Sequence, residues 1–388
     1  MNSPTSRQTP FIFLATPWGP VGGGMYKVAD YLIQAQAPSS HRPPESAELR
    51  GIDTRGNRSA ALSMVFLARA MWLLICGRFS GRLAGVHVNM AERLSVLRKG
   101  ILIALCSLLG IPVVLHLHAA QLPQFYRHLP AALRAMLRWV FSLPAVCIVL
   151  GSSAKQFVAQ ELGVPLSKIE IVINGVPEPS VPRRMATPGA PQRVLFLGNL
   201  TERKGVSDLL QALALMGLDD SRLNVRLAGG GDLATYREKA RRLGVDSLVH
   251  FEGWADQNKV AQLLAAADVL ILPSYDEGLP LVILEALANG VAVICTPVGE
   301  IPNVLTDGLN VTFVQPGDID AIAANLRRLL EQPTLREKFE RNGREIYESA
   351  FSVTKFFDKV AEIHLRCFGV RASRKSKPRM LWNPVLDA

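Results

Sequence analysis

The chain has 388 residues, of which 49% are hydrophobic, and a formal net charge of +10 at neutral pH. This length accommodates two domains with full hydrophobic cores, and the globular composition excludes a largely disordered chain. No stretch reaches the ~20 uninterrupted apolar residues that a membrane-spanning helix needs, because Arg69 interrupts residues 60–76 and Gly110 and Pro112 interrupt residues 101–117.

The cysteines and the first apolar run indicate a cytosolic protein. The five cysteines are scattered, odd in number and without a CxxC spacing, which favours reduced thiols in apolar segments over disulfides or a metal site. The early run "FIFLATPWGP" has five apolar residues before it breaks, so it predicts a first strand and not a secretory signal.

The positive charge is concentrated in two segments. Residues 51–150 hold eleven Lys or Arg against two Asp or Glu, and the tail 371–388 holds five against one. In "RLSVLRKGILIALCSLLG" and "RHLPAALRAMLRWVF" the basic residues alternate with Leu, Met and Trp, a pattern typical of helices on an anionic membrane surface. Nucleic-acid binding and ordinary core helices with basic edges are the alternatives. Because few aromatic residues are available for base stacking, we prefer the membrane.

Short apolar runs alternate with helix-length stretches along the whole chain, which predicts an α/β protein with doubly wound parallel sheets. A segment with five prolines, 177–192, separates two such series and is interpreted as a linker. The runs expected to be strands are "FIFLA", "GVHVN", "PVVLHLH", "AVCIVLG", "IEIVING", "RVLFLGN", "NVRLAGGG", "LVHFEG", "DVLILPS" and "VAVICTP".

In open α/β sheets the ligand lies beyond the carboxyl ends of the strands, so the loops after strands are informative. After the first strand, Gly22-Gly23-Gly24 opens a helix, where backbone N–H groups can approach an anion. The later run "PVVLHLHAAQ" places His116 and His118 on one face of a strand end, and His118 is positioned to donate to a sugar hydroxyl or a phosphate. Ordinary turn glycines and a strand-end histidine bonded to backbone are the alternatives.

In the second series, Arg203 and Lys204 lie between a strand and a helix, where two cations form an anion site. The turn that contains Gly229 and Gly230 also follows a strand, so its backbone can approach a flat base or a ribose. A solvated basic loop is the alternative for the two cations.

The stretch "YDEGLPLVILEALANG" places Glu277 just before a helix and Glu285 inside it. Pro280 suits a first helical position and Asn289-Gly290 suits the end, which predicts a helix of about three turns. Eight residues correspond to roughly 80° of rotation and 12 Å of rise, so the two acids cannot share a metal but can hold two ends of a long ligand. A solvated acidic helix is the alternative.

The block 268–318, with "NLTERKG", "INGV" and "HLHA", resembles the retaining GT-B glycosyltransferases of family 4. The first half, with "ATPWGPVGGGMYKVADYL" and "VHVNMAERLSVLRKG", is similar to the α-mannosyltransferases of xanthan- and acetan-type exopolysaccharide assembly. The resemblance implies two Rossmann-like domains facing a central cleft. It further implies that mannose passes from GDP-mannose to a cellobiosyl-diphosphopolyprenol.

The resemblance also implies residue roles. Glu277 contacts the donor sugar, Glu285 holds the ribose, Arg203 and Lys204 stabilise the leaving diphosphate, and His118 lies near the transfer site. These roles make His118, Glu277, Arg203 and Lys204 the catalytic set. The remaining donor-binding residues would be Gly23, Gly24, Gly229, Gly230, Gly278 and Leu279.

One departure concerns "PVGEIPNVL", which has Glu300 and Asn303 where the family often shows a second glycine and a glutamate. Retention through an internal-return mechanism follows from the resemblance, and Glu277 as a covalent nucleophile is the rival. We find no acidic pair with metal-ligand spacing and expect no metal cofactor.

The expected domains are 1–180 for acceptor and membrane binding, 181–350 for the nucleotide sugar, and 351–388 for a helix that crosses back to the first domain, followed by a basic tail. This organisation suits a peripheral protein on the cytoplasmic face of the inner membrane, with no nucleic-acid partner. Alternatives are a UDP-sugar donor, a nucleotide-sugar 2-epimerase, and a non-enzymatic basic module.

Overall fold

The computed structural model describes residues 9–19, 23–38, 43, 46–56, 63–184, 192–218 and 222–375. The chain divides into two compact units. Unit 1 comprises the described residues of Met1–Gly175 and Val353–Pro378, and unit 2 comprises those of Val176–Ser352. The expected linker 177–192 lies partly outside the described residues.

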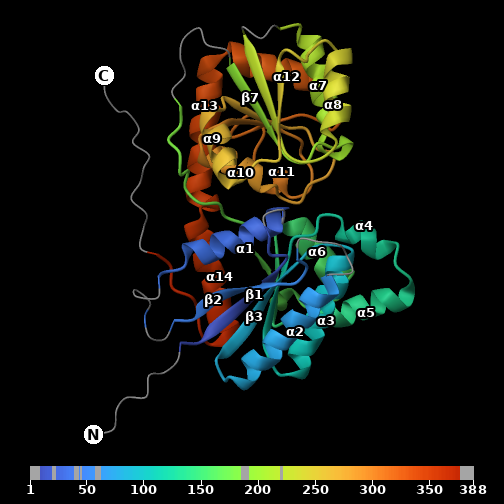
Figure 1. Cartoon of the computed structure of the whole chain (residues 1–388), viewed down its shortest axis with the longest axis vertical. Helices are drawn as coiled ribbons and strands as arrows, with labels where there is room; N and C mark the ends of the chain where they lie inside the picture. The colour runs from blue at the N-terminus through green and yellow to red at the C-terminus, as the bar shows by residue number, and fades with distance from the viewer. Residues whose placement is uncertain are drawn as a thin grey trace. The chain divides into compact units, whose positions relative to one another are not determined.

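Unit 1 is built on a six-stranded parallel sheet with the order β2-β1-β3-β4-β5-β6. Figure 1 labels the first three strands of this sheet, β1, β2 and β3. Its elements are β1 (Phe11–Thr16), α1 (Gly23–Ala35), β2 (Glu48–Asp53), α2 (Ser63–Phe79), β3 (Leu83–Met90), α3 (Leu94–Leu108), β4 (Val113–Leu117), α4 (Leu122–Arg127), α5 (Ala131–Ser142), β5 (Val146–Val149), α6 (Ser152–Gln160), a 3-10 turn (Leu166–Lys168), β6 (Ile169–Ile171) and α14 (Val353–Phe368).

Helices cover both faces of this sheet. Side chains of α2, α3, α5 and α6 share one buried hydrophobic cluster with the strands. Helix α14 packs on α1 and on β3 and β4. The C-terminal helix expected to return to the first domain therefore belongs to unit 1.

Unit 2 has a second six-stranded parallel sheet, with the order β12-β11-β10-β7-β8-β9. Its elements are β7 (Gln192–Leu197), a 3-10 turn η3 (Glu202–Lys204), α7 (Val206–Met216), β8 (Leu223–Ala228), α8 (Leu233–Arg242), β9 (Val249–Gly253), α9 (Gln257–Ala266), β10 (Val269–Leu272), α10 (Leu281–Ala288), β11 (Ala292–Cys295), α11 (Ile301–Val304), β12 (Thr312–Phe313), α12 (Ile319–Glu331), α13 (Pro333–Ile346) and a π-helical turn η4 (Tyr347–Phe351).

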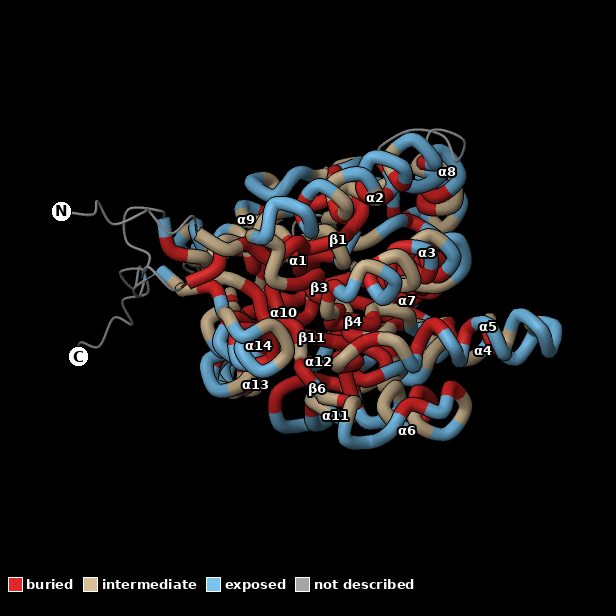
Figure 2. The backbone as a smooth tube through the Cα atoms, turned by 90° about the horizontal axis from the view of Figure 1, so that it is seen from below, coloured by how far each residue is buried: buried red, intermediate tan, exposed pale blue. Residues whose placement is uncertain are grey.

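The central strands are buried on both faces, as expected for parallel sheets covered by helices (Figure 2). Aspartates at helix starts fix several boundaries, since the side chains of Asp232, Asp256 and Asp318 accept backbone N–H bonds at the first turns of α8, α9 and α12. The predicted α/β architecture with parallel doubly wound sheets is therefore confirmed.

The cysteine expectation is only partly correct. Cys106, Cys147 and Cys295 are buried, whereas Cys76 is exposed on α2. Burial raises the pKa of the Cys106 and Cys147 thiols to about 12, so these two are inert core residues at neutral pH.

Helices α2, α3 and α5, of which α2 and α5 both contact α3, carry most of the large hydrophobic side chains exposed on the described part of unit 1. None of the three contains Asp or Glu, and together they carry Arg69, Arg78, Arg98, Arg134 and Arg138. Eleven of the eighteen large hydrophobic side chains exposed in the described chain lie on them, which is why this face differs from a usual solvated surface: Met64, Val65, Trp72, Phe79, Leu94, Leu97, Ile101, Leu108, Leu133, Met136 and Trp139. Within the described ranges, no helix has the length and apolar character needed to cross a bilayer.

Candidate functional site

The strand order of unit 2 places a topological switch point between β7 and β10. Strand β7 pairs with β8 on one side and with β10 on the other, so the chain winds in opposite directions from this pair. Ligands of open α/β sheets bind at such a point, beyond the carboxyl ends of the strands. The loop after β7 carries Arg203 and Lys204, and the loop after β10 carries Glu277.

These two loops are bonded to each other. Lys204 Nζ donates to Glu277 Oε1 in an ion pair whose side chains are only 14% and 9% exposed. Arg203 Nη1 donates to the carbonyl of Asp276 at 3.0 Å, and the carbonyl of Arg203 accepts from Tyr275 N at 2.8 Å. The two expected phosphate-binding cations and the expected sugar-binding carboxylate therefore lie at one place, with Arg203 exposed beside the buried pair.

Helix α10 differs from the expected one in its start and length. It runs from Leu281 to Ala288, about two turns at 3.6 residues per turn instead of three. Pro280 occupies the position before the helix with an extended backbone, not the first helical position. Glu277 therefore lies three residues before the helix cap, and Glu285 is a buried residue of the helix itself.

Close backbone contacts fix the surrounding loops. A Cβ atom on Gly229 would lie 1.9 Å from the carbonyl oxygen of Gly198, so a side chain there would separate the loops after β8 and β7. Gly230 is less restricted, and its carbonyl accepts from Leu200 N at 2.7 Å. The glycine turn thus forms part of the same carboxyl edge as Arg203.

Sequence reasoning missed Gly299, which supports Glu277 from the loop after β11. Its φ is +60°, and a Cβ there would lie 2.0 Å from the carbonyl oxygen of Glu277. The neighbouring Glu300 N donates to the carbonyl of Gly278 at 2.9 Å. The available signal was a glycine in the loop that follows β11, within the block 268–318.

The two departures from the family pattern and the remaining donor residues have defined places. Asn303 Nδ2 donates to Glu300 Oε2 at 2.7 Å, so the two unusual side chains bond to each other. The carbonyl of Gly278 accepts from Glu300, and the Leu279 side chain is buried. Any contact from Gly278 or Leu279 to a donor would therefore involve backbone more than the leucine side chain.

In unit 1 the glycine loop follows β1, beside the switch point between β1 and β3. Helix α1 begins at Gly23, and both Gly23 and Gly24 are exposed, while Gly22 lies outside the described residues. Gly23 has a φ of +63°, and a Cβ there would meet no atom within 4 Å. Glycine is therefore favoured at position 23 by the backbone conformation and not by close packing.

His118 follows the last residue of β4 and is half-buried. Its ring lies beside that of His116 at a centroid distance of 4.0 Å, which confirms that the two histidines share a face. His118 Nε2 bonds to Asn89 Oδ1 at 2.8 Å. Burial, and next the charge of His87, lower the pKa of His118 to about 3, so the ring is neutral at physiological pH.

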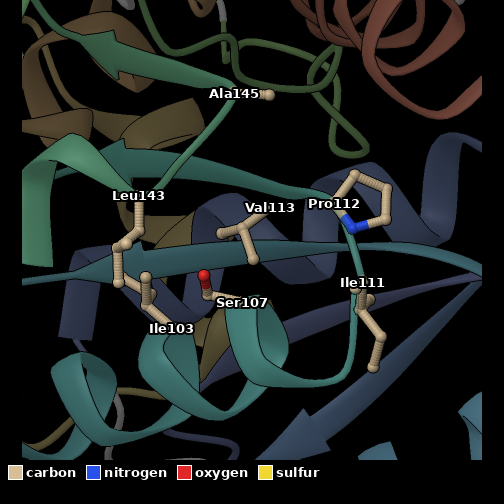
Figure 3. Close-up of a pocket in the computed structure, with 8 residues that line it drawn as sticks. Ile103, Ser107, Ile111, Pro112, Val113, Leu143 and Ala145 are labelled. Carbon is tan, nitrogen blue, oxygen red and sulfur yellow. The ribbon is translucent and has the colours of Figure 1, made fainter.

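A cavity of about 270 Å³ in unit 1 lies away from these residues. Figure 3 shows its lining at the end of α3 and the start of β4, which is the amino edge of the sheet, whereas His118 lies at the carboxyl edge. The lining residues are Ile103, Ser107, Gly110, Ile111, Pro112, Val113, Leu143 and Ala145. Its lining side chains are mostly apolar and none is charged, so the cavity is not a candidate for the phosphates.

Comparison with known proteins finds similarity to glycosyltransferases, strongest in the second unit. The model for glycosyl transferases group 1 matches residues 180–346. A glycogen synthase of Mycobacterium tuberculosis is 26% identical over 293 residues, 74% of this chain and 69% of that protein. An MMP alpha-(1->4)-mannosyltransferase of Mycolicibacterium hassiacum is 33% identical over 153 residues, 38% of this chain and 36% of that protein.

Solved structures agree on the fold. A sucrose-phosphate synthase of Thermosynechococcus elongatus superposes with a TM-score of 0.74 at 18% identity, covering 93% of this chain and 100% of that one. The Anabaena protein HepE, in complex with UDP-glucose, gives a TM-score of 0.69 at 17% identity, covering 91% and 98%. With two Rossmann-like parallel-sheet units, this chain has the fold of GT-B glycosyltransferases, and the family match lies within its second unit.

Proposed function

We propose that the protein is a retaining α-mannosyltransferase that moves mannose from GDP-mannose to a polyprenyl-diphosphate-linked oligosaccharide, such as a cellobiosyl-diphosphopolyprenol, in exopolysaccharide assembly. The observation that carries the proposal is the bonded arrangement of Arg203, Lys204 and Glu277 at the switch point of unit 2. The mannosyltransferase relative and the resemblance of the first half support mannose as the sugar.

Each residue has a role in this reaction. As the glycosidic bond breaks, negative charge grows on the departing diphosphate, and Arg203 and Lys204 stabilise it. Lys204 is already held by Glu277, so donor binding exchanges a carboxylate for a phosphate oxygen at Nζ and frees Glu277 Oε1 for a sugar hydroxyl. Glu285 binds the ribose, and the backbone at Gly229 and Gly278 contacts the nucleotide sugar.

Two cations at the leaving group supply the charge that a divalent metal supplies in other transferases, so the proposed transfer is metal-independent. In unit 1, His118 contacts a sugar hydroxyl. We assign the acceptor to unit 1 and the nucleotide sugar to unit 2.

The acid-free surface of α2, α3 and α5 suits an anionic bilayer, where the acceptor lipid is located. Five arginines provide attraction to acidic headgroups, and exposed Trp72, Trp139 and Leu97 provide apolar contact. The protein would then lie peripherally on the cytoplasmic face of the inner membrane.

The function is tested with radiolabelled GDP- and UDP-sugars and a lipid fraction that carries glucosyl-diphospholipids, in the presence of EDTA. We expect label from GDP-mannose in the organic phase. Label from a UDP-sugar would support a glycosyltransferase but contradict GDP-mannose as the donor. This alternative has support because HepE was solved with UDP-glucose. Interconversion of a nucleotide sugar in solution without lipid labelling would indicate a 2-epimerase.

Membrane binding is tested separately by vesicle sedimentation with phosphatidylglycerol or phosphatidylcholine. Leu97→Glu on α3 should weaken binding to the anionic vesicles about tenfold or more, since burial of a leucine side chain contributes about 1.5–3 kcal/mol. The matched control is Leu215→Glu on α7 of unit 2, because Leu97 and Leu215 are 52% and 58% exposed. Equal losses in both variants would contradict a docking face on α2, α3 and α5.

A further inference from the structure

A row of polar side chains lies under α14 on one face of the β3–β4 ladder. Asn89 of β3 is directly opposite His116 of β4, with His87 two residues before Asn89 and His118 two residues after His116. Because side chains two residues apart in a strand share a face, all four point to the same side of the sheet. Helix α14 adds His364 to the row.

Three of these histidines are joined by ring-to-ring hydrogen bonds, while Nε2 of the buried His116 has no partner in the part of the chain that the structure describes. His87 Nδ1 bonds to His364 Nε2 at 2.9 Å, and His87 Nε2 bonds to His116 Nδ1 at 3.3 Å. All three are fully buried or nearly so, and burial lowers their pKa values, that of His87 to about 3. A neutral imidazole has one donor and one acceptor nitrogen, so this chain uses both nitrogens of His87.

His118 is held differently, by an amide. Asn89 is fully buried, and its Oδ1 lies 2.8 Å from His118 Nε2. A carbonyl oxygen only accepts, so Nε2 of His118 carries the proton of the neutral ring. The lone pair is then on Nδ1, and that nitrogen is an acceptor.

We propose that Asn89 is a positioning residue that holds His118 in the Nε2–H tautomer, so that Nδ1 of His118 accepts a hydrogen bond from a hydroxyl group of a bound sugar. This inference rests on the proposed function and narrows it, because an acceptor nitrogen suits a sugar hydroxyl and repels a phosphate oxygen. It replaces the expectation from sequence that His118 donates to a hydroxyl or a phosphate.

The tautomer is measured directly in the ligand-free full chain by two-bond 15N–1H correlation spectra of the histidine rings. Wild type should show a protonated Nε2 and an unprotonated Nδ1 at His118. Asn89→Leu should abolish this preference, whereas Asn325→Asp on α12 should leave it unchanged. A protonated Nδ1 in wild-type His118 would overturn the inference while leaving the transferase proposal intact.

Asn89→Asp keeps an acceptor for Nε2–H but adds a negative charge, so it should raise the pKa of His118. Two titratable groups act on this ring among the described residues, His87 on β3 and His116 on β4, and His87 in turn bonds to His364 on α14. Burial lowers the pKa of all three, so they are neutral in the fold. The variant should therefore lose kcat as the pH falls below neutrality, where wild type keeps it. Asn89→Leu should lower kcat about tenfold at every pH, or about 1.4 kcal/mol in transition-state free energy.

If Asn89 had only a structural role, Asn89→Leu and Asn89→Asp would both be less stable, but kcat of Asn89→Asp would not fall at acidic pH. That result would contradict a positioning role. If no donor supports transfer, the proposed function fails, and the ring spectra still decide the tautomer of His118. The two failures are therefore distinguishable.

Discussion

The ion pair between Lys204 and Glu277 predicts non-additive effects of substitution. Lys204→Met leaves a carboxylate that is nearly buried without its cation, and Glu277→Gln leaves the ammonium group without its carboxylate. The double variant removes both charges. The losses of unfolding free energy in the two single variants should therefore add up to more than the loss in the double variant.

The magnitude follows from the burial of the pair. A hydrogen bond to a charged group contributes about 1.5–3 kcal/mol, and the low exposure of 14% and 9% leaves little solvent screening. We expect each single variant to lose about 2 kcal/mol of unfolding free energy. For a domain of about 150–250 residues this lowers Tm by about 4–8 °C.

The assay is urea denaturation of wild type, both single variants and the double variant, followed by the same cycle on kcat for transfer from GDP-mannose. A coupling energy of about 1–3 kcal/mol in stability is expected for a direct contact. In the kinetic cycle, Lys204→Met should lower kcat on the order of a hundredfold, since it removes charge stabilisation from the leaving group. Stability effects that add within about 0.5 kcal/mol would refute the ion pair.

Two further predictions concern other contacts. Gly299→Ala should destabilise the chain by about 3 kcal/mol or more and weaken donor binding, because its Cβ would meet the carbonyl of Glu277 at 2.0 Å. Gly308→Ala is the matched control, with a φ of +70° and open space around its Cβ, and equal denaturation midpoints would exclude a steric role for Gly299. Burial lowers the pKa of Lys99 well below its usual 10.5, so the unfolded chain binds more protons than the folded one between these two values. Unfolding free energy should therefore rise with pH across that window, and Lys99→Met should remove this slope. The check is denaturation of both proteins at several pH values. The same slope in wild type and Lys99→Met would mean that the Lys99 amine is solvated in the fold.

The alternation of apolar runs predicted the two parallel sheets because buried parallel strands are continuously apolar. Two edge strands were not predicted in this way. Strand β2 contains Glu48, Arg50 and Asp53, which an edge position tolerates, and β12 has only two residues. The start of α10 was wrong by one residue because Pro280 satisfies either position locally.

The residues of the candidate site were predicted from the sequence, but the contacts between them were not. The loop position of Arg203, Lys204 and Glu277 follows from strand endings, which are visible in the chain. Their bonding depends on β7 lying beside β10, and sheet order is a tertiary property that spacing does not encode. The pairing of Asn89 with His118 was hidden for the same reason, since it depends on the register between β3 and β4.

The most direct test of the account is transfer of radiolabel from GDP-mannose to glucosyl-diphospholipid by the wild-type chain, with the Lys204→Met chain alongside and EDTA in both reactions. We expect labelled lipid with wild type and on the order of a hundredfold less with Lys204→Met. Equal labelling by the two proteins would contradict the assignment of the leaving diphosphate to the Lys204 site.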